Sequence, residues 1–263
     1  AMISNSRLLG FISKICNLIY SGVTKIVVLS PGFKDLLIDR GVPENKIEII
    51  YNWADEKVLR TTTIETSKEF ESIEGFKVLF AGNVGQAQGL NVVLDAALLL
   101  KENVPNIRFL VLGQGLKLDD LKRRAKELKL DNVHFLPPVG MEKVGSFLGL
   151  ADALLIHLNF DPIFEITIPG KTQAYMAVGK PIIMGVSGDA SNLILRADCG
   201  VCFEPEDSVA LSEAAKSLML LDSTDIQKLG ENAERFYDEH LSVKVGVDSF
   251  EKVFNEVIDS GQR

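Results

Sequence analysis

The sequence predicts an α/β protein in which a Rossmann-like parallel sheet is covered by helices on both faces. Short apolar runs alternate with amphipathic segments of helical length along most of the 263 residues. Apolar strands separated by such helices are typical of a parallel sheet that is buried on both faces. The composition agrees with this, because 46% of the residues are hydrophobic and a chain of this length then buries a large core.

The first 60 residues predict a small α/β unit of their own. KIVVLS predicts a strand whose last residue, Ser30, is the N-cap of a helix with Pro31 at its first position, where a proline loses no hydrogen bond. A second strand is expected at KIEIIYN, residues 46–52. The polar stretch at residues 61–75 has no apolar period and predicts a linker between domains.

From residue 76 onward, strands and helices alternate regularly. Strands are expected at residues 76–85, 107–115, 133–139, 152–158, 180–186 and 201–205. Helices are expected at residues 90–102, 118–128, 141–151, 171–179, 191–198, 208–221, 223–241 and 243–260. In a doubly wound sheet, ligands bind beyond the carboxyl ends of the strands, so a site is expected in the loops that follow strands.

Charge and cysteine content argue against several classes of protein. A net charge of −8 is unfavourable for a nonspecific nucleic-acid binder, because a phosphate backbone demands clustered lysine and arginine. The most basic stretch, residues 117–130, also carries acids and predicts an amphipathic helix with a solvated face. Three cysteines are too few for a disulfide framework, and the CxxC pair Cys199 and Cys202 lies in an expected strand, where a structural role is favoured.

The N-terminal segment, residues 1–22, predicts a helix with one apolar face. Lys14 and Asn17 interrupt its apolar residues, and the chain contains no run of about 18 apolar residues that would span a membrane. The apolar face is expected to pack against protein or, as the less common alternative, to lie on a membrane surface.

Glycine-rich loops follow two of the expected strands. AGNVGQAQG carries Gly82, Gly85 and Gly89, and GQG carries Gly113 and Gly115. Glycines let a backbone approach a ligand closely at the start of the next helix. The spacing is not the GxGxxG of dinucleotide-binding domains and a P-loop is absent, so neither hydride transfer nor P-loop chemistry is expected.

Lys171 indicates an anion at a further strand end. Pro169 and Gly170 place this lysine in the first turn of a helix expected to end near Gly179. A cation at a helix N-terminus is unfavourable by about 0.3–1 kcal/mol, but a phosphate bound there would be attracted by the helix N–H groups and by the ammonium together. The alternative is a lysine that points into water.

Taken together, these motifs resemble those of a group 1 (family 4) retaining glycosyltransferase. FAGNVGQAQGL, FLVLGQG, NVHFLPPV, CGVCFEPED and above all TIPGKTQAYMAVGKPII carry the resemblance, which follows family order over nearly the whole chain. Within the family the chain is most similar to the N-acetylfucosamine-transferase-like branch of bacterial surface polysaccharide synthesis. The resemblance implies the GT-B fold, in which the C-terminal of two Rossmann-like domains holds the nucleotide-sugar donor, and it implies that no metal or other cofactor takes part.

The resemblance also implies a domain organisation. Residues 1–60 would be the C-terminal remnant of the acceptor domain, residues 61–75 a linker, residues 76–240 the donor-binding domain, and residues 241–263 a helix that crosses back. Most of the acceptor domain is then expected upstream of a truncated chain, with Ala1 and Met2 interpreted as a cloning remnant. Trp53 is expected to pack near the hinge between the domains, and Tyr175 in the core.

The implied donor site gathers residues from several strand ends. Lys171 and Glu165 are the catalytic candidates, Lys171 because its charge would neutralise the leaving diphosphate and Glu165 as a contact of the donor sugar. The other expected donor-binding residues are Gly82, Asn83, Gly85, Gln88, Gly113, Gly115, Phe135, Leu136, His157, Asp161, Thr167, Pro169, Gly170, Gln173 and Asp189. For Glu165 the alternative is a solvent-facing carboxylate, and for His157 it is a structural role.

The chain departs from the family pattern at two places. Asn83 and Gln88 stand where many relatives carry arginine and lysine, so two positive charges are lost. The two glutamates that relatives carry eight residues apart fall on Ile166 and Ala174, the first one step beyond Glu165. The usual carboxylate contact with the ribose hydroxyls is therefore in question. The expected substitutes are Gln173 and Asp189.

The expected function is transfer of a sugar, an N-acetylated hexosamine or a 6-deoxyhexosamine, from a UDP-sugar to a glycan or polyprenyl-linked acceptor with retention of configuration. The expected partners are this donor and this acceptor, without nucleic acid. A cytoplasmic location is expected, with peripheral association with the inner membrane through the absent N-terminal domain. The alternatives are a nucleotide-sugar-binding fragment without catalysis and, ranked third, a sugar-nucleotide 2-epimerase.

Overall fold

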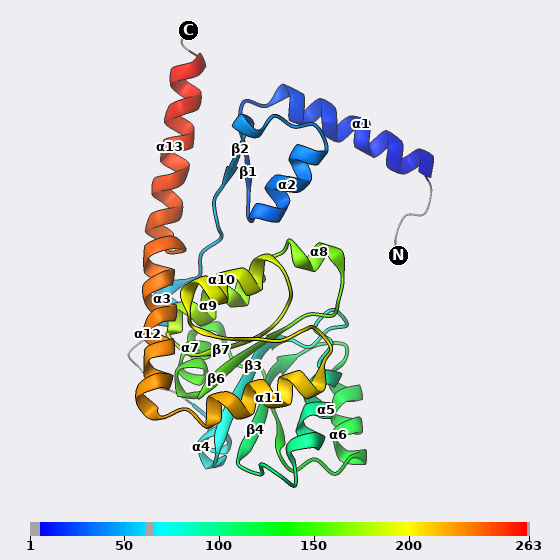
Figure 1. Ribbon diagram of the computed structural model, residues 1–263, viewed down its shortest axis with the longest axis vertical. Coiled ribbons are helices and arrows are strands. Elements are labelled where there is room, and N and C mark those ends of the chain that lie inside the picture. Colours follow the sequence, from blue (N-terminus) through cyan, green and yellow to red (C-terminus); the bar gives the residue numbers. More distant parts are fainter. Residues whose placement is uncertain (1–5, 61–65, 262–263) are drawn as a thin grey trace.

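Six parallel strands form the main sheet of the protein, in the order β5-β4-β3-β6-β7-β8. Figure 1 labels the central four, β4, β3, β6 and β7. The computed structural model describes residues 6–60 and 66–261. The strands are β3 (Phe76–Asn83), β4 (Ile107–Gln114), β5 (Val133–Leu136), β6 (Ala153–His157), β7 (Ile182–Gly185) and β8 (Gly200–Cys202). The chain adds β4 and β5 on one side of β3 and then the other three strands on the opposite side. The predicted Rossmann-like sheet is therefore confirmed.

Helices cover both faces of this sheet, and each face has its own core. Alternate residues of β3 point to opposite sides, so Leu79 belongs to one core and Phe80 to the other. Residues of α7, α9, α10 and α12 contribute to the first core, and residues of α5, α6 and α11 to the second. The helices are α5 (Asn91–Leu100), α6 (Leu118–Glu127), α7 (Met141–Leu150), α8 (Pro162–Glu165), α9 (Gly170–Val178), α10 (Asp189–Ala197), α11 (Ser208–Met219) and α12 (Ser223–His240).

A smaller unit precedes the main sheet. It consists of α1 (Ser6–Gly22), β1 (Ile26–Val28), α2 (Pro31–Asp39), the 3-10 helix η1 (Glu44–Lys46) and β2 (Ile47–Ile49). We call residues 6–49 the small lobe and residues 66–241 the large lobe (Figure 1). Strands β1 and β2 pair in parallel, and the Ser30 side chain accepts a hydrogen bond from the Phe33 N–H. The predicted strand, N-cap and second strand are thus confirmed.

Residues 50–55 make the first connection between the lobes. The Ala54 N–H donates a hydrogen bond to the hydroxyl oxygen of Tyr237, on α12, at 3.1 Å. The Trp53 ring packs edge-on against Phe250, with 6.4 Å between the ring centroids. Trp53 therefore lies at the junction of the lobes, as the sequence predicts. The one-turn helix α3 (Glu56–Leu59) follows.

Helix α13 (Val243–Gly261) makes the second connection, because it follows α12 and runs alongside the small lobe (Figure 1). The Lys25 Nζ atom lies 3.2 Å from a carboxylate oxygen of Glu256. The residue that directly precedes β1 thus forms an ion pair with this helix. The division of the chain into domains at residues 60, 75 and 240 stays a prediction.

Short helices account for most differences from the sequence-based expectation. Residues 61–65 of the predicted linker lie outside the described residues, but the rest of that stretch contains α4 (Lys68–Ser72). Ser67 caps this helix and Phe70 is buried. A single turn with one buried aromatic residue produces no apolar period, which is why the pattern did not reveal α4. Helices α3 and α8 are missed for the same reason.

Helix α1 forms as predicted, and its apolar face is exposed to a large extent. The side chains of Phe11, Leu18 and Ile19 are exposed by 61%, 73% and 56%. No helix within the two described ranges is long and apolar enough to cross a bilayer. The two alternatives for this apolar face stay predictions. Ala1 and Met2 lie outside the described residues.

Candidate functional site

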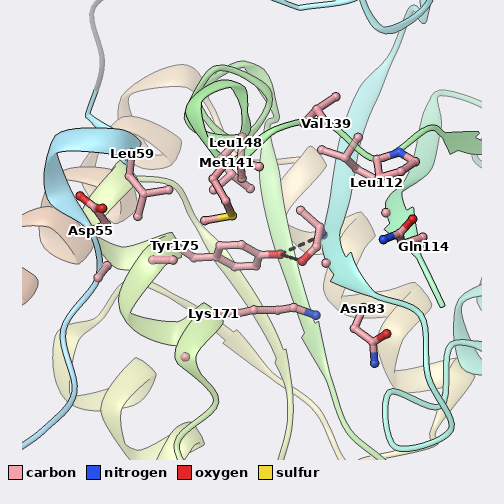
Figure 2. A pocket seen from close by; sticks show the side chains of 18 residues that line it. Asp55, Leu59, Asn83, Leu112, Gln114, Val139, Met141, Leu148, Lys171 and Tyr175 are labelled. Atoms are coloured by element: carbon pink, nitrogen blue, oxygen red, sulfur yellow. Dashed lines mark hydrogen bonds between the residues drawn. The ribbon is translucent and has the colours of Figure 1, made fainter.

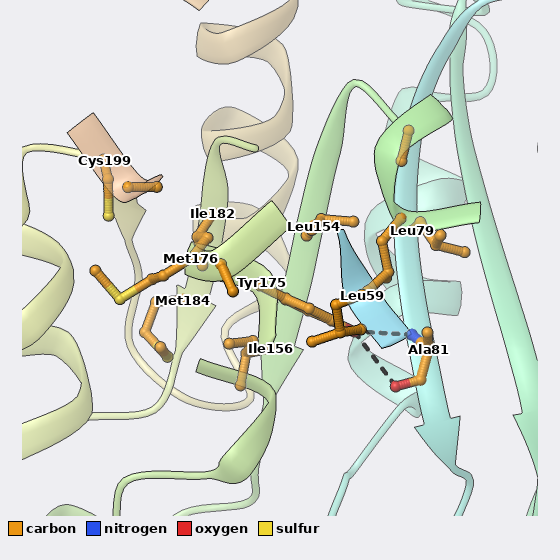
Figure 3. Close-up of a cluster of buried hydrophobic side chains, with 14 of the residues drawn as sticks. Leu59, Leu79, Ala81, Leu154, Ile156, Tyr175, Met176, Ile182, Met184 and Cys199 are labelled. Atoms are coloured by element: carbon orange, nitrogen blue, oxygen red, sulfur yellow. Dashed lines mark hydrogen bonds between the residues drawn. The ribbon is translucent and has the colours of Figure 1, made fainter. Parts of the chain in front are cut away.

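The site lies where β3 and β6 separate. These neighbours pair only through Val78 and Leu79 of β3, whereas β3 pairs with β4 as far as Asn83. The Tyr175 hydroxyl takes the place of the missing strand: it accepts a hydrogen bond from the Ala81 N–H at 3.0 Å and donates one to the Ala81 carbonyl at 3.3 Å (Figure 3). Since the strand order reverses between β3 and β6, ligands are expected at this gap.

A cavity of about 550 Å³ opens at this carboxyl edge of the sheet (Figure 2). It is bounded by the ends of β3 and β4, by α7 and α9, and by residues 54–59. Of the described residues that line it, only Lys171 and Asp55 are charged. The residues predicted from the sequence that line it are Gly82, Asn83, Gly113, Gly170 and Lys171.

Helix α9 presents its N-terminus to the cavity through Gly170 and Lys171. Pro169 is the N-cap and makes no side-chain hydrogen bond to the helix. The positive end of the helix dipole is therefore not neutralised by a capping side chain. The helix ends at Gly179, whose φ of 71° is the left-handed conformation of a helix C-cap.

The Lys171 side chain is half-buried rather than extended into water. Its Nζ atom lies 3.6 Å from the centroid of the Phe80 ring, a cation–π contact. It passes close to Gly82, where a Cβ atom would stand 2.8 Å from the lysine Cε and where φ is +133°, so only glycine fits. Burial lowers the pKa of the Lys171 ammonium to about 7, and no carboxylate of the described residues contributes to that pKa.

Gln88 closes the glycine loop that follows β3. Its side-chain oxygen accepts hydrogen bonds from the Gly85 N–H at 3.0 Å and from the Asn83 side-chain amide at 3.3 Å. Asn83 and Gln88, the two neutral residues where the family resemblance implies basic ones, thus bond to each other. Of the two, Asn83 lines the cavity.

The ends of β4 and β5 contribute less than the sequence predicts. Gly113 pairs with Gly82 across the sheet and lines the cavity, whereas Gly115 does not. Phe135 and Leu136 pack with the two hydrophobic cores. Pro138 and Val139, shortly after the end of β5, line the cavity instead.

His157 is buried and holds the glycine loop rather than lining the cavity. Its Nε2 atom accepts a hydrogen bond from the Glu206 N–H at 2.9 Å, so the ring is neutral and Nδ1 donates to the Gln88 carbonyl at 2.7 Å. Burial lowers the pKa of the imidazole. Both ring nitrogens are therefore engaged with the backbone, which is the geometry of the structural alternative.

The segment around α8 stands outside the cavity lining. Asp161 caps α8 by accepting a hydrogen bond from the Ile163 N–H at 2.9 Å, and the Thr167 hydroxyl donates to the Ile163 carbonyl at 2.6 Å. The Glu165 side chain is exposed, as in the solvent-facing alternative. Contacts of this segment with a donor sugar stay predictions.

Neither expected substitute for the ribose contact reaches the cavity. Gln173 is 2% exposed, and its side-chain oxygen has no hydrogen-bond partner among the described residues. Asp189 instead bonds to the small lobe, because its Oδ2 atom accepts a hydrogen bond from the Gly32 N–H at 2.7 Å. Ala174, where the family resemblance implies a glutamate, does line the cavity and offers it only a methyl group.

Sequence reasoning missed most of the apolar wall and one acid. Met141, Val144 and Leu148 line the cavity from one face of α7, and Leu59 lines it from α3. Their helical spacing is visible in the sequence, but the same spacing is typical of any core-facing helix. Asp55 comes from the connection between the lobes, and no local signal links it to the cavity.

The described residues also include potential metal ligands and thiols. No group of three or more His, Cys, Asp or Glu residues that could hold a metal occurs in residues 6–60 and 66–261. Metal independence nevertheless stays a prediction. Cys199 and Cys202 are free, and burial raises the pKa of the Cys199 thiol to about 12, which disfavours a reactive thiolate.

Comparison with known proteins identifies a family and several relatives of this chain. Residues 63–236 match the model of the family described as "Glycosyl transferases group 1". The probable glycosyltransferase WbjE of Pseudomonas aeruginosa is 25% identical over 237 residues, which are 88% of this chain and 58% of the relative. The putative colanic acid biosynthesis glycosyl transferase WcaI of Escherichia coli K12 is 25% identical over 76% of this chain and 50% of its own length. The chain thus spans about half the length of these curated relatives.

Solved structures share the fold. Anabaena HepE in complex with UDP and glucose superposes with a TM-score of 0.73 at 17% identity, over 91% of this chain and 65% of HepE. WaaG, a glycosyltransferase involved in lipopolysaccharide biosynthesis, superposes with a TM-score of 0.68 at 19% identity, over 86% of this chain and 61% of WaaG. At this identity the likeness shows the fold alone, which is that of GT-B glycosyltransferases.

Proposed function

The chain belongs to the group 1 glycosyl transferases, and on that premise we propose that its large lobe binds the nucleotide-sugar donor of a glycosyl transfer reaction. The observation that carries this proposal is the pairing of Lys171 with the uncapped N-terminus of α9 at one cavity. A helix N-terminus and an ammonium together form a site for a diphosphate.

Lys171 acts on the leaving group. When the bond between the anomeric carbon and the β-phosphate oxygen breaks, negative charge develops on that oxygen, and a positioned ammonium stabilises it. The half-buried position of Lys171 strengthens this interaction, because less water screens it. The Gly82 backbone lies directly against the lysine and brings the glycine loop to the diphosphate.

The rest of the cavity takes the nucleoside. Its wall of Leu59, Met141, Val144 and Leu148 offers apolar surface to a base and a pentose, with Val139 and Gly113 supplying backbone groups. We assign the base as uracil, supported by the presence of UDP in the HepE complex. Among the described residues at the lining, the charged groups are one lysine and one aspartate, Asp55, and none is a histidine. This favours transfer over 2-epimerisation, which needs acids and histidines around the sugar.

The finer assignments rest on the sequence resemblance. They are retention of configuration, an N-acetylated hexosamine or 6-deoxyhexosamine as the donor sugar, and a glycan or polyprenyl-linked acceptor, as in the N-acetylfucosamine-transferase-like branch. Metal independence and peripheral association with the cytoplasmic face of the inner membrane belong to the same proposal. The names of WbjE and WcaI support the coarser part of the proposal, glycosyl transfer.

Thermal unfolding with UDP tests the role of Lys171. A ligand at about 100 times its Kd stabilises the native state by about 2.7 kcal/mol, which raises the Tm of a protein of this size by about 5–10 °C. We expect this rise for the wild type and its loss in Lys171→Ala. Lys180→Ala is the matched control, since Lys180 is half-buried at the other end of α9 and does not line the cavity. An equal rise of the Tm with UDP in both variants would show that Lys171 does not bind the diphosphate.

A second candidate function is nucleotide-sugar binding without catalysis. Its support is the cavity itself, whose described lining provides for a nucleoside and a diphosphate. The two candidates differ in one measurement: transfer of radiolabelled sugar from a UDP-sugar to a polyprenyl-linked acceptor. Binding of UDP without transfer would support the binding fragment, and transfer would contradict it.

A further inference from the structure

Segments of both lobes meet at the N-terminus of α2. The Gly32 N–H donates a hydrogen bond to Oδ2 of Asp189 at 2.7 Å. The fully buried Ser30 hydroxyl donates to the Ile166 carbonyl at 2.5 Å. Asp189 is the first residue of α10 and Ile166 lies between α8 and α9, so both bonds cross from the small lobe to the large one (Figure 1). We call Ser30, Gly32, Ile166 and Asp189 the interlobe clasp.

Close packing fixes the geometry of the interlobe clasp. A Cβ atom on Gly32 would overlap both the Cβ and the Cγ2 atoms of Ile166. On the other side, Gly188 has a φ of 79°, and a Cβ atom there would overlap the carbonyl group of Glu165. The backbone at residues 165–166 is therefore held between the start of α2 and the start of α10.

Charge adds to this packing. Asp189 stands in the first turn of α10, and its carboxylate also accepts a hydrogen bond from the first turn of α2. Both helix ends carry partial positive charge, so one carboxylate is stabilised by two dipoles. A hydrogen bond to an ionised acceptor is stronger than a neutral one. Asp189 is thus committed to the contact between the lobes rather than to the cavity where the sequence pattern expected it.

We propose that the interlobe clasp positions residues 161–169 for the sugar of the donor. This rests on the proposed function, in which Lys171 binds the diphosphate, and on the sequence-based expectation that Asp161, Glu165 and Thr167 contact the donor sugar.

Ile166 lies between α8 and α9, so a displacement of Ile166 displaces residues 161–169. Helix α9 itself is held separately, by the hydrogen bonds between Tyr175 and Ala81, so the diphosphate site stays in place. Ser30 and Asp189 are positioning residues in this scheme, because they hold the segment and not the donor.

Comparing two ligands separates positioning from a general effect on folding. UDP engages only the nucleoside and diphosphate sites, whereas UDP-N-acetylglucosamine also needs residues 161–169. In calorimetric titrations of Asp189→Ala and Gly32→Ala, we expect the affinity for UDP-N-acetylglucosamine to fall about tenfold, as for the loss of a charged hydrogen bond. The affinity for UDP should stay within about twofold. Asp189→Asn, which keeps an acceptor oxygen, should lie in between.

Lys34→Ala is the matched control. Lys34 lies on α2 beside the clasp, but its ion pair with Glu44, at 2.8 Å, is internal to the small lobe. This variant should leave both affinities unchanged. An equal fall for both ligands in Asp189→Ala and Gly32→Ala, or no fall for either, would overturn the proposal.

Hydrogen exchange tests the clasp without any ligand. Asp189→Ala should speed amide exchange in residues 31–39 and 161–169 while β3 and β4 keep wild-type rates, which also shows that the variant is folded. Unchanged exchange in residues 161–169 would show that the clasp does not hold this segment. If wild type binds neither nucleotide, the proposed function fails, whereas the exchange rates still decide whether the clasp positions the segment.

Discussion

Lys171 destabilises the folded protein but favours the binding of an anion. A half-buried lysine without a carboxylate partner is unfavourable for the folded state, and its contact with the Phe80 ring offsets only part of that cost. Because burial lowers its pKa to about 7, the ammonium loses its proton in the ligand-free protein far more readily than an exposed lysine does. An adjacent diphosphate would raise this pKa again, since opposite charge favours the protonated form.

Donor affinity should therefore depend on pH. The phosphates of UDP-N-acetylglucosamine do not titrate near neutral pH. Any proton taken up on binding therefore goes to a group of the protein. We expect its affinity to be constant below pH 7 and to weaken above it, approaching tenfold per pH unit until the pKa of the complex is reached. Calorimetric titrations between pH 6 and 9 measure this.

Lys171→Arg provides the control for this pH dependence. An arginine keeps its charge throughout the range, so the affinity of this variant, though weaker, should not change with pH. If the variant kept the wild-type slope, a group other than Lys171 would be responsible for the proton uptake.

At the scale of elements, Tyr175 joins α9 to β3 at the point where β6 leaves the sheet. It stands one helical turn after Lys171, and both side chains extend from α9 toward the end of β3 (Figure 2). Burial raises the pKa of the Tyr175 phenol, so the hydroxyl stays protonated and can donate to the Ala81 carbonyl. The position of the diphosphate site thus depends on a strand gap being closed by a side chain.

Tyr175→Phe should expose this dependence. The change leaves a buried N–H and carbonyl of Ala81 without their partner, which costs about 1–3 kcal/mol. We expect a lower urea midpoint and a several-fold weaker affinity for UDP, because α9 is no longer fixed beside β3. Tyr237→Phe, which also loses a bond to a buried backbone N–H but lies at α12, should lower stability without a matching loss of UDP affinity. An unchanged UDP affinity in Tyr175→Phe would show that packing alone holds α9.

The same elements show what sequence can predict. Strands and long helices follow from periodicity, and Lys171 is recognised because a cation is unexpected at a helix start. One-turn helices such as α4 leave no period, and the cavity wall around Met141 has the spacing of an ordinary core helix. Asp189 takes its place through a contact between the lobes. Asp55 lines the cavity from the connection between the lobes. No local pattern predicts either placement. The roles of His157 and Gln88 likewise emerge from hydrogen bonds between distant loops.

At the scale of the whole molecule, the two lobes differ greatly in buried core. The small lobe has a core of four buried residues, Val28, Leu37, Val42 and Ile47. The large lobe has two extensive cores, one on each face of its sheet. The lobes are held together by residues 50–55, by α13 and by the interlobe clasp.

This difference predicts two levels of stability. Local opening is least costly where few apolar residues are buried, so the amides of β1 and β2 should exchange faster with solvent than those of β3 and β4, by about two orders of magnitude or more. Native-state hydrogen exchange with mass spectrometry measures both sets in one experiment. Val28→Ala should speed exchange of β1 and β2, since it removes a buried side chain from the small core, and should leave β3 and β4 unchanged. Equal exchange in all four strands would mean that the lobes unfold as one cooperative unit, and then the small core gains its stability from the large lobe through α13 and the clasp.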